Sequence, residues 1–199
     1  MIVYLIGIIE YIMNRRLSQI FYSDLYRYDG KSGFREFTKR ILRTPAFRYT
    51  FFFRLSSNSK GIKKIIYHRL ILRRMSFKYG YQIEPDTIIG QGLYLGHHGT
   101  IIINPRAILG DNINIAPGVV IGKTNRGKKM GVPLIGNNVW IGANSTIVGG
   151  ITIGNNVLIA PNCHVDNDVE DNTIIKANNI VCFSSKTATL DYINNTIDE

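Results

Sequence analysis

The chain has 199 residues, enough for one or two domains with a real core, and its two cysteines, Cys163 and Cys182, are too few for a disulfide framework. A disulfide-stapled secreted domain is therefore excluded, and a reducing, cytoplasmic compartment is expected. The formal net charge of +10 comes from residues 1–82, which hold 17 Lys and Arg against 4 Asp and Glu, whereas residues 83–199 hold 7 against 10. The basic part indicates either an anionic neighbour (phosphates, an acidic glycan or a membrane surface) or a solvated helical face.

The first 13 residues are apolar except for Glu10. This run is too short to span a bilayer, which takes about 20 residues. Arg15 and Arg16 follow the run instead of preceding it, and no small-residue cleavage site is present, so a secretory signal is not expected. We expect an amphipathic or buried helix that docks on a partner subunit or lies on a membrane face.

Residues 1–80 are predicted to form a helical region, because apolar residues recur at steps of three and four, as in Phe34, Phe37 and Ile41. Breaks are expected at Asp29-Gly30, at Thr44-Pro45 and over residues 56–61, which divides the region into about four helices.

From residue 83 onward, one apolar residue recurs every six positions. The members are Ile83, Ile89 and Leu95; Leu109, Ile115 and Ile121; and Ile135, Ile141, Ile147, Ile153, Ile159 and Val165. A sustained period of six is neither helical nor simple alternation, and it is typical of a parallel β-helix, in which three hexads make one triangular coil. The chain is thus predicted to be mainly β, with about five coils over residues 81–183 and a polar, lightly attached tail at 184–199.

The six-residue period is interrupted between Ile121 and Ile135, where eight residues are inserted. The inserted stretch is polar and glycine-rich, and it carries Lys123, Arg126, Lys128 and Lys129. A loop that breaks a strict repeat is a candidate functional element, because rigid scaffolds present their sites on loops. A tolerated surface insertion is the alternative.

The chain has four histidines, and only His97 and His98 stand together, in a hexad followed by Gly99. One histidine by itself is usually a satisfied structural residue. A pair at a corner with a following glycine is more suggestive of a site, because the glycine lets a substrate approach the backbone closely.

The hexads, the Leu-Gly-His segment and the loop before Pro133 together resemble the left-handed β-helix acyltransferases over about residues 83–170. Within these, the chain is similar to serine acetyltransferases and their capsular-polysaccharide O-acetyltransferase relatives. The stretch that begins at Asp24 resembles their helical N-terminal portion. The resemblance implies a homotrimer with active sites in clefts between prisms, acetyl-CoA as co-substrate and no metal.

The resemblance also implies site residues. His97 is expected to be the general base in a direct transfer, with a backbone N–H near Gly99 or Gly122 facing the oxyanion. The family's aspartate position holds Gln82, so Glu84 is taken as the catalytic carboxylate. His98 and Asp24 are expected on the acceptor side. The expected acetyl-CoA contacts are Gly122, Gly142, Ala143 and Ala160, with Lys123, Lys128 and Lys129 near the phosphates.

Two departures bear on the acceptor. Gly96 stands where serine acetyltransferases carry an aspartate, and Lys129-Met130-Gly131 stands where they carry another histidine. Because both groups help to hold serine, we expect a saccharide hydroxyl as acceptor, in a capsular, exopolysaccharide or lipid-linked glycan. Serine O-acetyltransferase is the alternative.

Other classes of protein stay open. A zinc enzyme on the same prism needs three converging histidines, and a non-catalytic scaffold would not depend on His97. No nucleic-acid-binding motif is seen. Peripheral contact with the inner face of a membrane is an option for the basic, apolar N-terminal part.

Overall fold

The computed structural model describes residues 15–62, 66–177 and 181–197, so the helix expected within residues 1–13 lies outside the described residues. The helical elements described before the first strand are α2 (Arg15–Asp29), α3 (Phe34–Arg43), α4 (Pro45–Ser57), the π-helical η1 (Ile66–Leu72) and α6 (Arg73–Tyr79). α2 ends at the Asp29-Gly30 break, where Gly30 has a φ of 64°, and α3 and α4 meet at Thr44.

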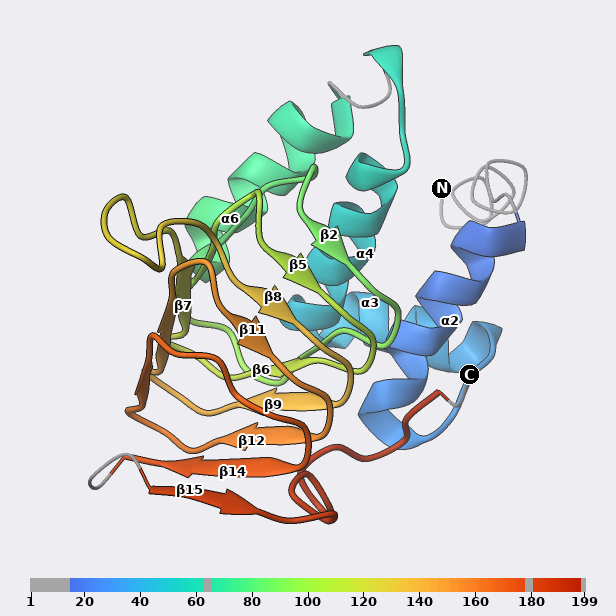
Figure 1. Cartoon of the computed structure of the whole chain (residues 1–199). Helices are drawn as coiled ribbons and strands as arrows, with labels where there is room; N and C mark the ends of the chain where they lie inside the picture. Colours follow the sequence, from blue (N-terminus) through green and yellow to red (C-terminus); the bar gives the residue numbers. More distant parts are fainter. Residues whose placement is uncertain (1–14, 63–65, 178–180, 198–199) are drawn as a thin grey trace.

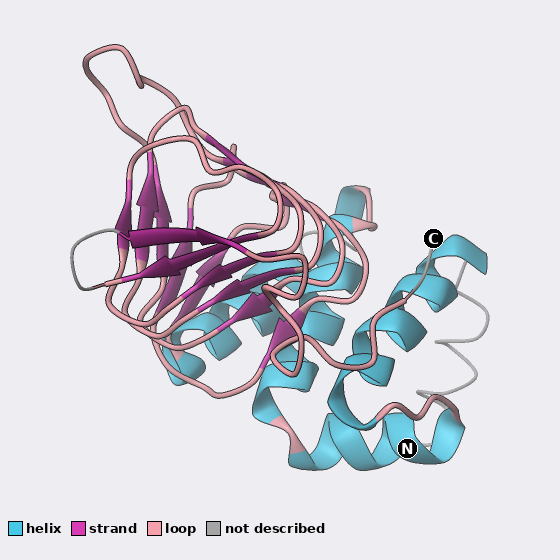
Figure 2. Ribbon diagram, turned by 60° about the horizontal axis from the view of Figure 1, so that its bottom comes forward, coloured by secondary structure: helices cyan, strands magenta, loops and turns pink. Residues whose placement is uncertain are grey.

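The strands form three sheets that the chain visits in turn, as in a triangular prism (Figures 1 and 2). Sheet A contains β1 (Tyr81–Ile83), β4 (Ile101–Ile103), β7 (Val120–Gly122), β10 (Thr146–Val148) and β13 (His164–Val165). Sheet B contains β2 (Ile88–Ile89), β5 (Ile108–Leu109), β8 (Leu134–Ile135) and β11 (Thr152–Ile153). Sheet C contains β3 (Tyr94–Leu95), β6 (Asn114–Ile115), β9 (Val139–Ile141), β12 (Val157–Ile159), β14 (Thr173–Lys176) and the antiparallel β15 (Val181–Ser184).

The core of the prism consists of the residues that recur every six positions. In sheet A, Ile83, Ile103, Ile121, Ile147 and Val165 are in register from coil to coil, and each is at most 5% exposed. Burying one such side chain contributes roughly 1.5–3 kcal/mol. The predicted parallel β-helix is therefore confirmed. The residue two positions before a hexad residue also points inward, as Ile101 does before Ile103, and it repeats with the same period of six.

The corner between sheets B and C is held by a ladder of side-chain oxygens. Asn137 Oδ1 accepts a hydrogen bond from the Asp111 N–H at 2.8 Å, and Asn155 Oδ1 accepts one from the Asn137 N–H at 2.8 Å. The next residue in each Asn pair, Asn138 or Asn156, has a φ near +54° (55° and 53°). Asn tolerates this left-handed backbone at low cost, which explains the Asn-Asn pairs of the sequence.

The helices cover the first coil, which would otherwise expose strand edges (Figure 1). Tyr49 Oη of α4 donates to the Ile83 carbonyl at 3.2 Å, and Tyr28 Oη of α2 donates to the Leu95 carbonyl at 3.2 Å. Tyr49, Phe53 and Leu72 belong to the same buried cluster as the hexad residues. The basic helical region and the β-helix thus share one core.

The tail differs from its expected loose attachment. Residues 185–197 run back from β15 toward α2 (Figure 1), and Asn114 Nδ2 on the outer face of sheet C donates to the Tyr192 carbonyl at 3.0 Å. The Trp140 and Tyr192 rings pack with their centroids 5.0 Å apart, and Ala188 is 2% exposed. Polar side chains on sheet C satisfy the tail backbone, which a polar composition alone does not reveal.

Candidate active site

His97 lies at the corner between sheets C and A in the first coil, after β3 and before β4, and its side chain is exposed. The backbone there is fixed on both sides. Tyr81 Oη donates to the His97 carbonyl at 2.9 Å, and the Gly99 N–H donates to the Tyr79 carbonyl at 3.0 Å. The geometry therefore presents an accessible imidazole on a rigid support, while the Gly99 N–H expected as an oxyanion donor is already engaged.

Gly99 is required by its surroundings. Its φ is 152°, and a Cβ on it would lie 2.9 Å from Pro117 Cβ of the next coil. This contact explains why a glycine follows the histidine pair. His98 lies in the same bend and is also exposed. Both histidines lie outside the strands, between β3 and β4.

A column of small residues runs down the same corner from His97. The residue that follows each sheet C strand is Gly96, Ala116, Gly142 or Ala160 in successive coils. The Gly142 N–H donates to the Ile159 carbonyl at 2.8 Å, and a Cβ on Gly142 would lie 2.5 Å from the Pro161 nitrogen. Glycine at 142 is thus explained by close coil stacking. Ala143 is the next residue in the chain. Gly142, Ala143 and Ala160 therefore lie at the same corner of the prism as His97, in later coils.

Gly122 and Lys123 lie at a different corner of the prism, where the strands of sheet A end and the chain passes to sheet B. Gly122 ends β7, and the inserted loop that starts at Lys123 forms a hairpin closed by a Thr124–Gly131 bridge. The hairpin projects from the prism (Figure 1), with Lys123 exposed and Lys129 paired to Asp168. Within one chain, sheet A separates this loop from His97.

Glu84 is not brought next to His97 either. It follows β1, in a turn where the Thr87 N–H donates to its carbonyl at 3.0 Å, whereas the His97 corner adjoins the start of β1. At about 3.3 Å per residue, the strand puts roughly 10 Å of backbone between the two corners. Glu84 and Gln82 instead line a pocket of about 680 Å³ between β1 and α6, together with Arg73 and Ser76.

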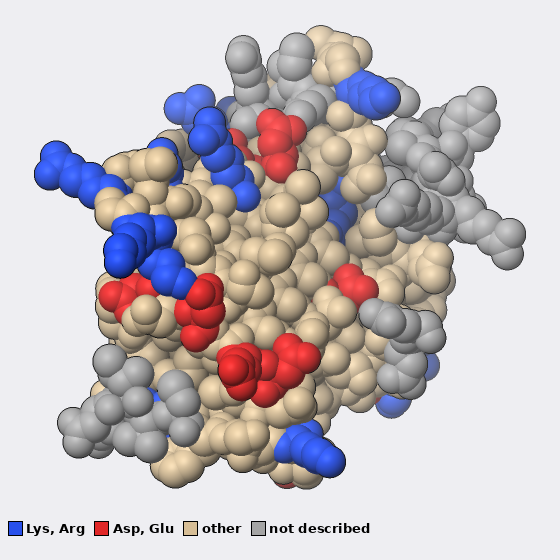
Figure 3. All heavy atoms as spheres, viewed as in Figure 1, with Lys and Arg blue, Asp and Glu red and all other residues tan. Residues whose placement is uncertain are grey.

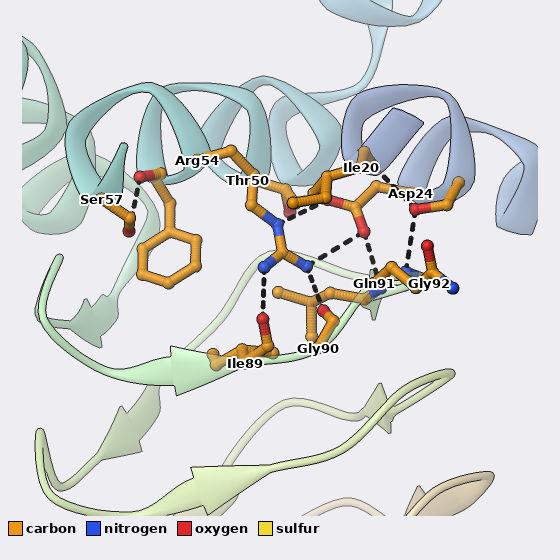
Figure 4. Close-up of polar contacts among 12 residues, drawn as sticks. Ile20, Asp24, Thr50, Arg54, Ser57, Ile89, Gly90, Gln91 and Gly92 are labelled. Atoms are coloured by element: carbon orange, nitrogen blue, oxygen red, sulfur yellow. Dashed lines mark hydrogen bonds and ion pairs between the residues drawn. The ribbon is translucent and has the colours of Figure 1, made fainter. Parts of the chain in front are cut away.

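Asp24 is placed inside the molecule, 1% exposed (Figure 4). Arg54 Nε donates to its Oδ2 at 2.8 Å and Arg54 Nη2 to its Oδ1 at 3.1 Å, while the Leu93 N–H donates to Oδ1 at 2.8 Å. Burial raises the pKa of the Asp24 carboxyl, and the Arg54 charge opposes this rise. A carboxylate with no solvent access cannot meet an acceptor, so we replace the expected substrate-binding role with a structural one.

Arg54 was not predicted from the sequence as a residue of interest. It is 4% exposed, and besides Asp24 it binds the Ile89 carbonyl at 2.6 Å and the Gly90 carbonyl at 2.5 Å (Figure 4). One charged residue within Phe51-Phe52-Phe53-Arg54-Leu55 was the available signal, because a charge inside an apolar helix needs a buried partner.

The zinc-enzyme alternative requires several metal ligands close together. The residues that the structure describes contain no group of three or more His, Cys, Asp or Glu side chains that could hold a metal ion. His164 lies on the outer face of β13, with Nε2 4.0 Å from Asp166 Oδ2. Within the described ranges, no helix is long and apolar enough to cross a membrane.

Known proteins resemble the chain in sequence. Residues 133–167 match the family described as bacterial transferase hexapeptide (six repeats). The serine acetyltransferase of Staphylococcus xylosus is 37% identical over 107 residues, which cover 54% of this chain and 50% of that protein. The Helicobacter pylori (strain ATCC 700392 / 26695) serine acetyltransferase is 33% identical over 101 residues, 51% of this chain and 59% of that one. The chain thus spans about half the length of these curated relatives.

Solved structures of serine acetyltransferases also resemble the chain. The Neisseria gonorrhoeae serine acetyltransferase is 29% identical with a TM-score of 0.67, covering 91% of this chain and 70% of that one. The same enzyme in complex with serine is 30% identical with a TM-score of 0.64, covering 82% and 67%. The chain belongs to the hexapeptide-repeat, left-handed β-helix acyltransferases, with serine acetyltransferases as homologues.

These relatives overturn the expected acceptor. The saccharide assignment rested on Gly96 and on the loop around Met130, but the relatives from Staphylococcus, Helicobacter and Neisseria are serine acetyltransferases. The assignment to polysaccharide biosynthesis was therefore wrong. Gly96 has a local reason of its own: a Cβ there would lie 3.0 Å from Tyr94 Cε1, so the Tyr94 ring occupies the space beside it.

Proposed function

We propose that the chain is an acetyl-CoA-dependent serine O-acetyltransferase with His97 as its general base. The observation that carries the proposal is the placement of an exposed imidazole at the head of the small-residue corner, in a fold whose relatives are serine acetyltransferases. The pocket beside β1 and α6 is the proposed acceptor site. Gly80 lines this pocket and packs against the segment that follows His97, since a Cβ on Gly80 would lie 3.1 Å from the Gly99 carbonyl carbon.

The chemistry is a direct transfer. His97 takes the proton from the serine hydroxyl as its oxygen attacks the thioester carbon of acetyl-CoA. The carbon–sulfur bond then breaks, and the imidazolium returns the proton to the departing thiolate. A neutral imidazole is suited to this task at physiological pH. No acyl-enzyme is needed, and Cys163, the thiol that the structure describes, is buried.

A homotrimer is part of the proposal. In one chain the His97 corner and the Lys123 loop lie at opposite ends of the sheet A strands, on two different corners of the prism. A cleft between two prisms would bring the corner of one chain toward the loop of another. The pantetheine arm would then follow Gly142, Ala143 and Ala160, with Lys123 and Lys128 free to meet phosphates. A cytoplasmic location is proposed from the scarcity of cysteine.

The test is the release of CoA from acetyl-CoA by the full chain, followed with a thiol reagent. L-Serine is expected to stimulate release saturably, with kcat on the order of 1–10³ s⁻¹. L-Alanine, which has the same ammonium and carboxylate but no hydroxyl, is the matched control and should give none. Release that serine does not raise above the rate with alanine would refute serine as the acceptor.

A further inference from the structure

Exposed apolar side chains lie along η1 and α6 and shortly before them. Ile62, Ile66, Leu70 and Phe77 are 68%, 41%, 55% and 80% exposed. We refer to these four residues, with Arg74 and Lys78, as the helix stripe. Single exposed apolar residues are ordinary, but four of them between residues 62 and 77 mark an interaction surface.

The direction of the stripe is fixed by what lies behind it. Leu72 is buried in the prism core, and Met75 and Tyr79 pack against that core. Tyr49 Oη lies 3.4 Å from Ser76 Oγ on the same inner side. Because Leu72 anchors η1 and the other residues anchor α6, Leu70 and Phe77 stay on the surface of the protein.

Charge identifies the kind of partner. Residues 59–83 contain seven Lys and Arg and no Asp or Glu. Arg74 and Lys78 are exposed beside the apolar residues. Most acidic side chains on the face in Figure 3 lie instead over the middle and lower coils of the prism. A second copy docked through the same stripe would bring like charges together, which costs free energy.

We propose that the helix stripe docks the protein peripherally on an anionic membrane surface. An amphipathic helix with Lys and Arg beside exposed Ile, Leu and Phe lies in the plane of the lipid headgroups. The apolar side chains would enter the boundary between headgroups and acyl chains, and Arg74 and Lys78 would meet lipid phosphates. Of the stripe residues, Phe77 also lines the pocket proposed for the acceptor, and none of the variants tested below alters it.

The test is co-sedimentation of the full chain with vesicles of phosphatidylcholine alone or mixed equally with phosphatidylglycerol. Binding is expected on the anionic vesicles, with loss at about 1 M salt, where the screening length is about 3 Å. Two double variants, Ile66→Ser with Leu70→Ser and Arg74→Gln with Lys78→Gln, should each lower the partition coefficient at least about tenfold. Leu134→Ser, which alters a 46% exposed leucine on sheet B, should leave it unchanged.

Several results would overturn the proposal. One is absence of wild-type binding to the anionic vesicles. Another is binding that the double variants keep but that deletion of residues 1–14 removes, which would assign docking to the terminal segment. A third is a change of oligomeric mass in the apolar double variant without any loss of vesicle binding, measured by light scattering; this would assign the stripe to a second copy. Thermal unfolding of each variant checks that it is folded.

Discussion

Replacing His97 with alanine is expected to lower kcat for serine acetylation by about 10² to 10⁴, the usual contribution of a general base. The serine hydroxyl has a high pKa, so without a base its attack on the thioester is slow. The side chain is exposed, and the backbone contacts of Tyr81 and Gly99 do not involve the imidazole. The KM for acetyl-CoA and the thermal unfolding temperature should therefore change little, and steady-state kinetics with circular dichroism measure both.

His164→Ala is the matched control, because His164 is also exposed on the prism but lies on β13, four coils away along sheet A. It should keep kcat within about twofold, as expected for a surface substitution away from the site. A His97→Ala enzyme with more than about a tenth of wild-type kcat would remove His97 from the role of base.

Replacing Asp24 with alanine is expected to lower the free energy of unfolding by about 3–5 kcal/mol, because it leaves the Arg54 guanidinium buried without its counter-charge. The change also removes the acceptor of the Leu93 N–H, which ties α2 to the first coil. Denaturation by urea, followed by circular dichroism, measures the loss. The size of this effect separates a structural carboxylate from an acceptor-binding one.

Two further variants sharpen this measurement. Lys39→Ala removes the exposed Lys39–Glu36 pair, at 3.5 Å, and should cost no more than about 1 kcal/mol. Combining Asp24→Ala with Arg54→Met removes both charges and should recover part of the loss. If Asp24→Ala costs no more than Lys39→Ala, the buried pair does not hold the helices on the prism.

The β-helix was predictable because its geometry imposes a strict rule on the chain. Each side of the prism repeats the same inward positions, so Ile135, Ile141 and Ile147 had to recur at six, and any longer step had to be a loop. The corner position of the His97-His98 pair was predictable for the same reason, whereas the choice of His97 as the base came from the family resemblance and stays a prediction. The corner at Asn137 and Asn138 could also be predicted, since a tight corner needs a left-handed backbone conformation that few residues besides Gly and Asn tolerate.

Contacts between distant parts of the chain were not predictable. Asp24 and Arg54 lie 30 residues apart on different helices, and only the packing of α2 on α4 brings them together. Glu84 was chosen because it is near Gln82 in sequence, yet the turn after β1 carries it to another corner. The acceptor was misread because Gly96 has a packing explanation in Tyr94 that the sequence alone does not show.

The most direct test of the proposed active site is a crystal structure of the protein with CoA bound. The proposed mechanism predicts that the CoA sulfur lies within about 4 Å of the His97 imidazole, close to hydrogen-bond reach. The pantetheine arm should then follow Gly142, Ala143 and Ala160. A CoA molecule bound with its sulfur far from His97, for example in the pocket of about 620 Å³ between sheet C and the tail, would contradict the proposal.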